Sequence, residues 1–208
     1  MLIHPWDAVT STADWMEFVR AQGFGHLVAA GRGRDVPVVV PTQYALMSAD
    51  LVLLHLARPN PVWAALDENP TVLLSVAGDW SYIPAAWKAI ADEDPRMGVP
   101  TTYYAAVQLI ATARIVDDED GKVAILREQL QVTEPGSDAA NPSEHGRTLA
   151  GIRGLRLEVH DVRAKFKYGG NVDDEHRAAV ARRLAERGAP GDAAALGHLA
   201  RRGEDFPR

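Results

Sequence analysis

The residues best suited to chemistry lie between His55 and Trp63, where an imidazole, a guanidinium and a helix start fall within nine residues. Leu51 to Ala57 has the composition of a buried strand. Asn60-Pro61 then predicts a helix start, with Asn as N-cap and Pro at the first helical position. First-turn amides have no partner inside a helix and carry the positive end of its dipole. With Arg58 beside them, they predict a site for a planar anionic cofactor. The alternative is a surface arginine near an ordinary cap.

His55 shares one strand face with Leu51 and Leu53. A lone histidine on an apolar strand is more often a satisfied core residue than a ligand. In a functional role it would donate a hydrogen bond to a cofactor ring or, as neutral imidazole, ligate haem iron.

Aromatic residues concentrate between positions 80 and 104. Their flat faces could stack on an isoalloxazine or a porphyrin, although core or dimer packing is the ordinary role for any single ring. Lys165 and Lys167 fall on the polar face of the last predicted strand. They could approach a phosphate, but solvated lysines are the more common case. The aromatic residues are Trp80, Tyr82, Trp87, Tyr103 and Tyr104.

The composition bounds the class of protein. The chain has 208 residues, 47% of them hydrophobic, a net charge of −6 and no cysteine. This predicts a single domain over 1–208 without disulfides or thiolate metal ligands. We expect a cytoplasmic protein without a membrane span. The negative charge argues against a broad surface for nucleic acid.

The apolar patterns predict strands separated mainly by hairpins, with helices at the margins. Repeated βα units are absent, so a small, mostly antiparallel barrel with peripheral helices is favoured over a doubly wound fold. A C-terminal helical extension is expected over about 173–202. The expected strands are 24–30, 36–46, 50–57, 71–77, 101–116 and 154–166, and the segment 80–84 is expected to be extended. The expected helices start near 11–14 and 61 and after 121, with loops at 85–99 and 134–147.

Four segments resemble the PaiB family of flavin-binding split-barrel proteins, also called FMN-binding negative transcriptional regulators. They are His55 to Trp63, Gly78 to Trp87, Val99 to Val107, and Ala164 to Lys167. The resemblance runs from about Leu2 to Gly188. It implies a six-stranded antiparallel split barrel and a homodimer with flavin or haem in clefts between the subunits.

The resemblance also implies cofactor-binding residues. His55, Arg58 and Asn60 match the cofactor-facing segment, and Lys165 matches the late basic strand. The family's Trp-Asn before Tyr104 is Thr102-Tyr103 here. Gln108 replaces a frequent histidine, and Tyr168 to Asn171 replaces Leu-Ser-Gln-Asn, so cofactor and substrate could differ from those of the best-known branch. The segments lining the same cleft contain Tyr82, Trp87, Thr101, Tyr103 and Tyr104.

These observations favour an FMN-binding protein, either an oxidoreductase acting on a small molecule or a flavin-linked regulator. The alternative is a haem b enzyme that forms an N–N bond, as in piperazate synthases, with His55 as axial ligand and Arg58 on a propionate. A DNA-binding regulator is a further alternative, but Glu175 and Glu186 dilute the arginines of the helix near 173–187. No catalytic residue is assigned, and no metal site other than haem iron is expected.

Overall fold

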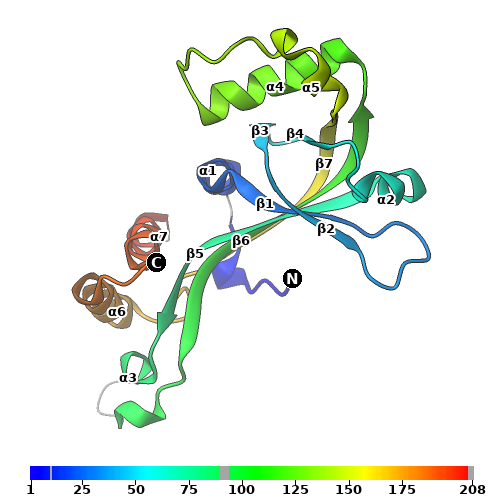
Figure 1. The fold of residues 1–208 in the computed structure, drawn as a ribbon. Coiled ribbons are helices and arrows are strands. Elements are labelled where there is room, and N and C mark those ends of the chain that lie inside the picture. The colour runs from blue at the N-terminus through cyan, green and yellow to red at the C-terminus, as the bar shows by residue number, and fades with distance from the viewer. Residues whose placement is uncertain (10, 90–93, 206–208) are drawn as a thin grey trace. The chain divides into compact units, whose positions relative to one another are not determined.

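The computed structural model describes residues 1–9, 11–89 and 94–205, and its seven strands form one sheet in the order β2-β1-β5-β6-β7-β4-β3 (Figure 1). The four strand pairs with a defined register are antiparallel. The mainly β, antiparallel fold with helices is therefore confirmed. The strands are β1 (Phe24–Ala29), β2 (Val38–Gln43), β3 (Ala45–Ser48), β4 (Leu51–Ala57), β5 (Thr71–Ile83), β6 (Thr101–Val116) and β7 (Ile152–Lys167).

The helices lie largely where the sequence places them. One difference is the expected loop at 85–99, which contains α3 and a 3₁₀ turn at Pro95–Met97, while residues 90–93 lie outside the described residues. None of the described helices combines the length and apolar character needed to cross a membrane. The helices are α1 (Thr12–Gln22), α2 (Val62–Glu68), α3 (Ala85–Lys88), α4 (Glu119–Thr133), α5 (Arg147–Ala150), α6 (Asp174–Arg187) and α7 (Asp192–Asp205).

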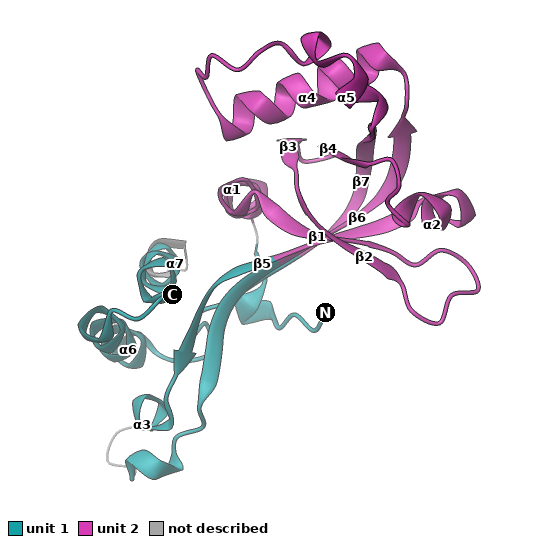
Figure 2. Ribbon diagram, viewed as in Figure 1, with its two compact units in different colours: residues 1–10, 77–106, 164–208 teal, residues 11–76, 107–163 magenta. Residues whose placement is uncertain are grey.

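The chain forms two compact units, each assembled from separate segments (Figure 2). Unit 1 contains residues 1–10, 77–106 and 164–208, and unit 2 contains residues 11–76 and 107–163. Three of the four boundaries fall inside β5, β6 and β7, so these three long strands contribute residues to both units.

The expected six strands are in fact seven, because the return strand predicted over 36–46 is interrupted at Tyr44. The Tyr44 side chain is buried, and its Oη donates to the Val19 carbonyl at 2.7 Å. Its backbone N–H donates to the Gly23 carbonyl at 3.3 Å. This anchoring on α1 and its cap divides the segment into β2 and β3, which occupy the two edges of an unclosed sheet.

In unit 2, α4 packs over one face of the β4–β7 ladder. Its N-terminus is capped by Asp118, whose side chain accepts from the Gly121 N–H at 2.7 Å. Ile125 of α4 is buried with Leu53 of β4 and Ala45 of β3. The opposite ladder face is the apolar core of the unit and contains Val52, Leu54, Leu56, Leu155 and Leu157, all buried.

In unit 1, Asp192 fixes the turn between α6 and α7 to β5. Its carboxylate accepts from Ser81 at 2.7 Å, from two nitrogens of Arg187 at 2.6 and 2.9 Å, and from the Ala189 N–H at 2.9 Å. These bonds, led by that of Arg187, lower the pKa of Asp192 to about 2.

The arginines of α6, considered above for DNA binding, largely make contacts within unit 1. Arg177 donates to the carbonyls of Val172 and Gly169, Arg183 to the carbonyl of Ala86 at 3.3 Å, and Arg187 to Asp192. Three arginines of α6 therefore make hydrogen bonds that attach this helix to neighbouring segments of unit 1.

Candidate functional site

Unit 1 contains a cavity of about 350 Å³ formed by the N-terminal segment, α3, the start of β6 and the end of β7. Its lining is distinctive in charge. The chain has four lysines, and Lys88, Lys165 and Lys167 all line this cavity. Asp7 is the one acidic residue in the lining that the structure describes. The described lining therefore has a formal excess of two positive charges.

Lys165 is buried, with 7% of its surface exposed, although the sequence places it on the polar face of β7. Its Nζ donates to the Leu2 carbonyl at 2.9 Å and lies 3.7 Å from Oδ2 of Asp7. The ammonium also lies 5.7 Å from the centre of the Tyr104 ring, within cation–π range. The ordinary interpretation of a solvated lysine is therefore wrong here, because the N-terminal segment covers this end of β7.

Lys88 and Lys167 form the more open cationic part of the cavity. Lys167 donates to Oγ1 of Thr101 at 2.6 Å. Burial and then the charge of Lys167 lower the pKa of Lys88 below its ordinary value of 10.5. Among the residues that the structure describes, Lys88 has no ion pair or side-chain hydrogen bond. An anion placed here would relieve the repulsion between the two lysines.

Aromatic rings complete the walls. His4 and Trp6 stack on each other, with ring centres 4.7 Å apart and planes 9° from parallel. Tyr103 is buried on β6 and packs edge-to-face on Tyr168, whose Oη donates to the Asp79 carbonyl at 2.8 Å. The cavity therefore combines cations with flat apolar faces.

Three of the sequence-predicted residues line this cavity, namely Thr101, Tyr103 and Lys165. Tyr104 contacts Lys165 from beside it. Tyr82 is half exposed on β5.

Trp87, also predicted, lies on α3, where Arg187 stacks over its ring at 4.7 Å. The sequence reasoning missed His4, Trp6, Asp7 and Lys88. The cluster His4-Pro5-Trp6-Asp7 and the rarity of lysine were the available signals.

The predicted residues His55, Arg58 and Asn60 belong to unit 2, where each has a partner. Arg58 forms a two-pronged ion pair with Asp117, at 2.5 and 3.1 Å, and its Nε donates to the Ala150 carbonyl at 2.8 Å. The hydrogen bond from Arg58 lowers the pKa of Asp117. The anion that the sequence leads us to expect beside Arg58 is thus a side chain of the same unit.

The helix start after Arg58 also differs by one residue from the prediction. α2 begins at Val62, with Pro61 rather than Asn60 at the N-cap. The Asn60 side chain still accepts from the Val62 N–H, at 3.0 Å. His55 is half-buried, and its Nδ1 lies 2.6 Å from Oε1 of Gln129. Cofactor binding by these three residues stays a prediction.

The structure thus combines an antiparallel sheet, helices at its margins and a cationic, aromatic-lined cavity of the size usual for small-molecule sites. The family model described as "Putative FMN-binding domain" matches residues 1–161, and the chain belongs to this FMN-binding family. It is also similar to "Protease synthase and sporulation protein PAI 2" of Bacillus subtilis (strain 168). The two are 24% identical over 180 residues, which is 84% of each chain.

Solved structures share the fold. The flavocytochrome Anf3 from Azotobacter vinelandii superposes with a TM-score of 0.62 and 21% identity, covering 84% of this chain and 75% of that one. The FAD and haem binding protein from Mycobacterium smegmatis gives a TM-score of 0.62 and 18% identity, covering 83% of this chain and 79% of that one.

Proposed function

We propose that this protein binds FMN and that the unit 1 cavity holds its phosphate. The observation that carries the proposal is the convergence of Lys88, Lys165 and Lys167 in one cavity of a chain that belongs to an FMN-binding family. A phosphate monoester carries close to two negative charges near neutral pH. The excess of two positive charges in the described lining matches that charge.

The lysines have different roles in this proposal. Lys165 is largely neutralised by Asp7 and the Leu2 carbonyl, so it orders the wall. Lys88 and Lys167 supply the charge that meets the phosphate, and Thr101 positions the Lys167 ammonium.

The parallel His4–Trp6 pair offers a flat face for an aromatic ring. The volume of the unit 1 cavity, about 350 Å³, lies within the usual range for small-molecule sites. Bound FMN would supply hydride or electron transfer, and we infer a flavin-dependent oxidoreductase acting on a small molecule. The protein's own residues would bind the cofactor and exclude water from it. The cytoplasmic location stays a prediction.

Titration of the purified protein with FMN and with riboflavin tests the proposal, because riboflavin lacks the phosphate. We expect Lys88→Gln and Lys167→Gln each to weaken FMN binding about ten- to hundredfold, the usual effect of losing one charge-assisted hydrogen bond. Riboflavin affinity should barely change.

The matched control is Arg96→Gln, which removes an exposed cation of the same unit that lies outside the cavity. It should leave both affinities unchanged. If FMN does not bind, or binds no more tightly than riboflavin, the phosphate site is refuted.

Haem is the second candidate cofactor, and the geometry of His55 favours it. Its Nδ1–H donates to Gln129 Oε1 at 2.6 Å, which leaves Nε2 as the nitrogen able to bind a metal. Metal-binding histidines commonly donate their other ring N–H in this way. Haem addition should then give a Soret band that Gln129→Leu shifts and His55→Ala abolishes. A band unchanged in His55→Ala would exclude this ligand.

A further inference from the structure

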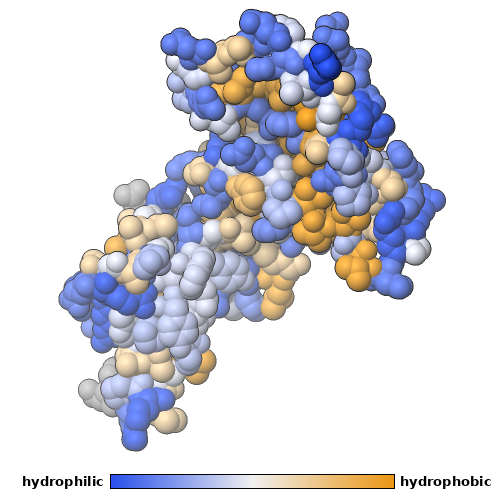
Figure 3. All heavy atoms as spheres, viewed as in Figure 1, coloured by the Kyte–Doolittle hydropathy of each residue, from blue (hydrophilic) through white to orange (hydrophobic). Residues whose placement is uncertain are grey.

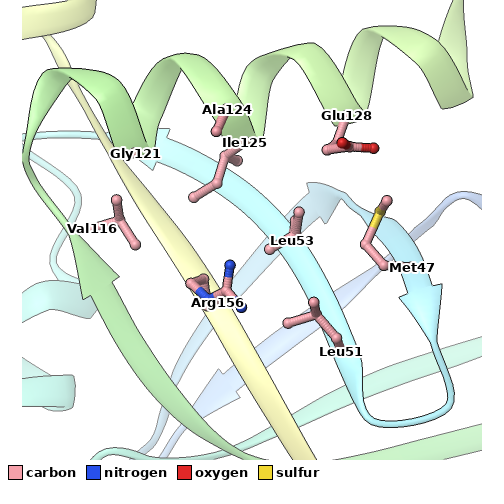
Figure 4. A pocket seen from close by; sticks show the side chains of 9 residues that line it. All are labelled: Met47, Leu51, Leu53, Val116, Gly121, Ala124, Ile125, Glu128 and Arg156. Carbon is pink, nitrogen blue, oxygen red and sulfur yellow. The ribbon is translucent and has the colours of Figure 1, made fainter.

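Unit 2 contains a second cavity, of about 290 Å³, between α4 and the sheet (Figure 4). Its roof is one face of α4, where Ile125 and Glu128 point toward the sheet. Its floor is formed by Leu51 and Leu53 of β4 and by Arg156 of β7, with Met47 and Val116 at the sides.

Close packing and polar anchors hold α4 beside this cavity. At Gly154, a Cβ would lie only 2.5 Å from Cδ1 of Ile125, so the helix approaches the sheet as closely as a glycine allows. Lys122 donates to the Leu149 carbonyl at 2.8 Å, and Gln129 accepts from His55 at 2.6 Å. Lys122 and Gln129 are both buried. The hydrogen bonds of Lys122 and Gln129 flank residues 124–128, and the Ile125–Gly154 contact lies within them, so the space beneath is a fixed feature of the unit.

The lining is chiefly apolar. Leu53 and Ile125 are buried, and Met47, Leu51 and Val116 pack against them. Figure 3 shows apolar atoms gathered beneath the hydrophilic outer surface of α4. A space of this kind favours a hydrocarbon body over water.

Arg156 gives the cavity its one cationic group among the described lining residues. It stands opposite Leu53 in the β4–β7 register. Neighbouring charges on β7 have partners, since Glu158 pairs with Arg114 at 3.1 Å and Arg153 with Asp117 at 3.2 Å. Arg156 takes part in no ion pair or side-chain hydrogen bond within the described part of the chain. Its guanidinium is therefore available beside an apolar floor.

We propose that this cavity is a binding site for a small apolar monocarboxylate. The hydrocarbon part packs on Leu53 and Ile125, and the carboxylate forms a two-pronged ion pair with Arg156, the geometry that guanidinium favours. Glu128 places a carboxylate on the roof, which repels negative charge, so the ligand's single carboxylate lies at the Arg156 end of the cavity and a second one is disfavoured. The site lies wholly within unit 2 and does not depend on the proposed FMN function.

Calorimetric titration of the full chain with hexanoate and phenylacetate tests the proposal. We expect saturable binding at millimolar concentration or below, and at least tenfold weaker binding in Arg156→Gln. The neutral amides and the matching amines should also bind at least tenfold more weakly than the acids. Arg163→Gln is the control variant, because Arg163 is an exposed arginine of the same strand outside the cavity.

Three results would overturn the proposal. They are the absence of binding by both acids, equal binding of acid and amide, and unchanged affinity in Arg156→Gln. Arg156 is exposed and unpaired among the described residues, so its replacement should leave folding intact. The amide comparison tests the charge requirement without any substitution. FMN binding, followed by flavin absorbance, should be unaffected by Arg156→Gln, which separates this site from the one proposed in unit 1.

Discussion

Lys88 and Lys165 line the same cavity, but their surroundings assign them different roles. Lys165 has a carbonyl, a carboxylate and an aromatic ring as neighbours, and its charge is already satisfied. Lys88 has the charge of Lys167 nearby, and its ammonium is partly desolvated. A partly desolvated ammonium beside a second positive charge destabilises the folded protein, and such an arrangement is typical of a site that binds an anionic ligand.

Lys88→Gln should therefore leave the free energy of unfolding unchanged or raise it at pH 7. Because the pKa of Lys88 is lower in the folded state than in the unfolded state, the charged lysine destabilises the folded protein at any pH below the folded-state pKa. This destabilisation decreases as the pH rises from the folded-state pKa toward 10.5, the ordinary pKa of lysine. Urea unfolding of both proteins at pH 7 and pH 10 measures the effect, and the difference should shrink at the higher pH. A variant clearly less stable at pH 7 would mean that Lys88 contributes a stabilising contact.

At this scale the sequence identified residue types better than partners. Thr101, Tyr103 and Lys165, which the sequence predicts to bind a cofactor, line one cavity of unit 1, and their role in binding stays a prediction. Arg58 was expected to bind the anionic group of a cofactor, but in the structure it forms an ion pair with Asp117, which lies 59 residues further along the chain. An acidic run such as Asp117–Asp120 is compatible with a solvated turn, so its pairing emerges only from the tertiary fold.

At the scale of elements, one buried carboxylate joins α6, α7 and β5. Asp192→Asn should lower the free energy of unfolding by about 1–3 kcal/mol at pH 7, because Arg187 and Ser81 lose a charged partner. The pKa of about 2 lies below the ordinary 3.8, so this stabilisation is present above pH 3.8 and is lost as pH falls through 2. Denaturant unfolding across this range measures it.

The control for this prediction is Asp161→Asn, because Asp161 pairs with Arg163 on the surface, where such pairs add little. It should change the stability hardly at all. Equal stability of Asp192→Asn and the parent protein at pH 7 would contradict the assigned role of Asp192.

The contact between α4 and β7 gives a second test at this scale. Gly154→Ala would bring a Cβ to 2.5 Å from buried Ile125 and 3.3 Å from Cβ of Val116, and should destabilise by about 1–3 kcal/mol. Gly197→Ala is the matched control, because that helical position has no atom within 4 Å of a new Cβ. It should stabilise by about 0.5–1 kcal/mol. Thermal unfolding of both variants would show opposite shifts, and shifts of the same sign would contradict this packing.

Elements with strong local signals were predicted well. The bounds of β6 match the expected 101–116, and α1 starts at Thr12, within the expected 11–14. The break between β2 and β3 was missed, because it depends on Tyr44 reaching a carbonyl of α1, 25 residues away. Periodicity reports which face a residue takes but not which distant group anchors it.

At the scale of the whole molecule, the sequence predicted the class and the family but not the strand order. Local patterns favour hairpins between consecutive strands, yet β1 pairs with β5 as well as β2, and β4 pairs with β7. Such pairings join segments about 50 to 100 residues apart. The three long strands also divide their residues between two compact units, which composition alone does not reveal.

We propose that the protein is a homodimer, as the family resemblance implies. Trp80 and Tyr82 lie two residues apart on β5 with 62% and 50% of their surfaces exposed, although large aromatic groups are usually covered in a working assembly. Light scattering should give a mass of about twice the 22.6 kDa of the chain. The double variant Trp80→Glu, Tyr82→Glu should shift it toward the monomer, because like charges would be desolvated in the contact.

Val132→Glu is the control for this experiment, since it places the same charge on an exposed apolar position of α4 in unit 2. It should leave the mass unchanged. Dissociation by both variants would indicate a general effect of added negative charge on a chain whose net charge is already −6, rather than a contact through β5. A monomeric parent protein would reject the dimer, and the FMN site could then be complete within one chain, since every residue assigned to the phosphate comes from unit 1.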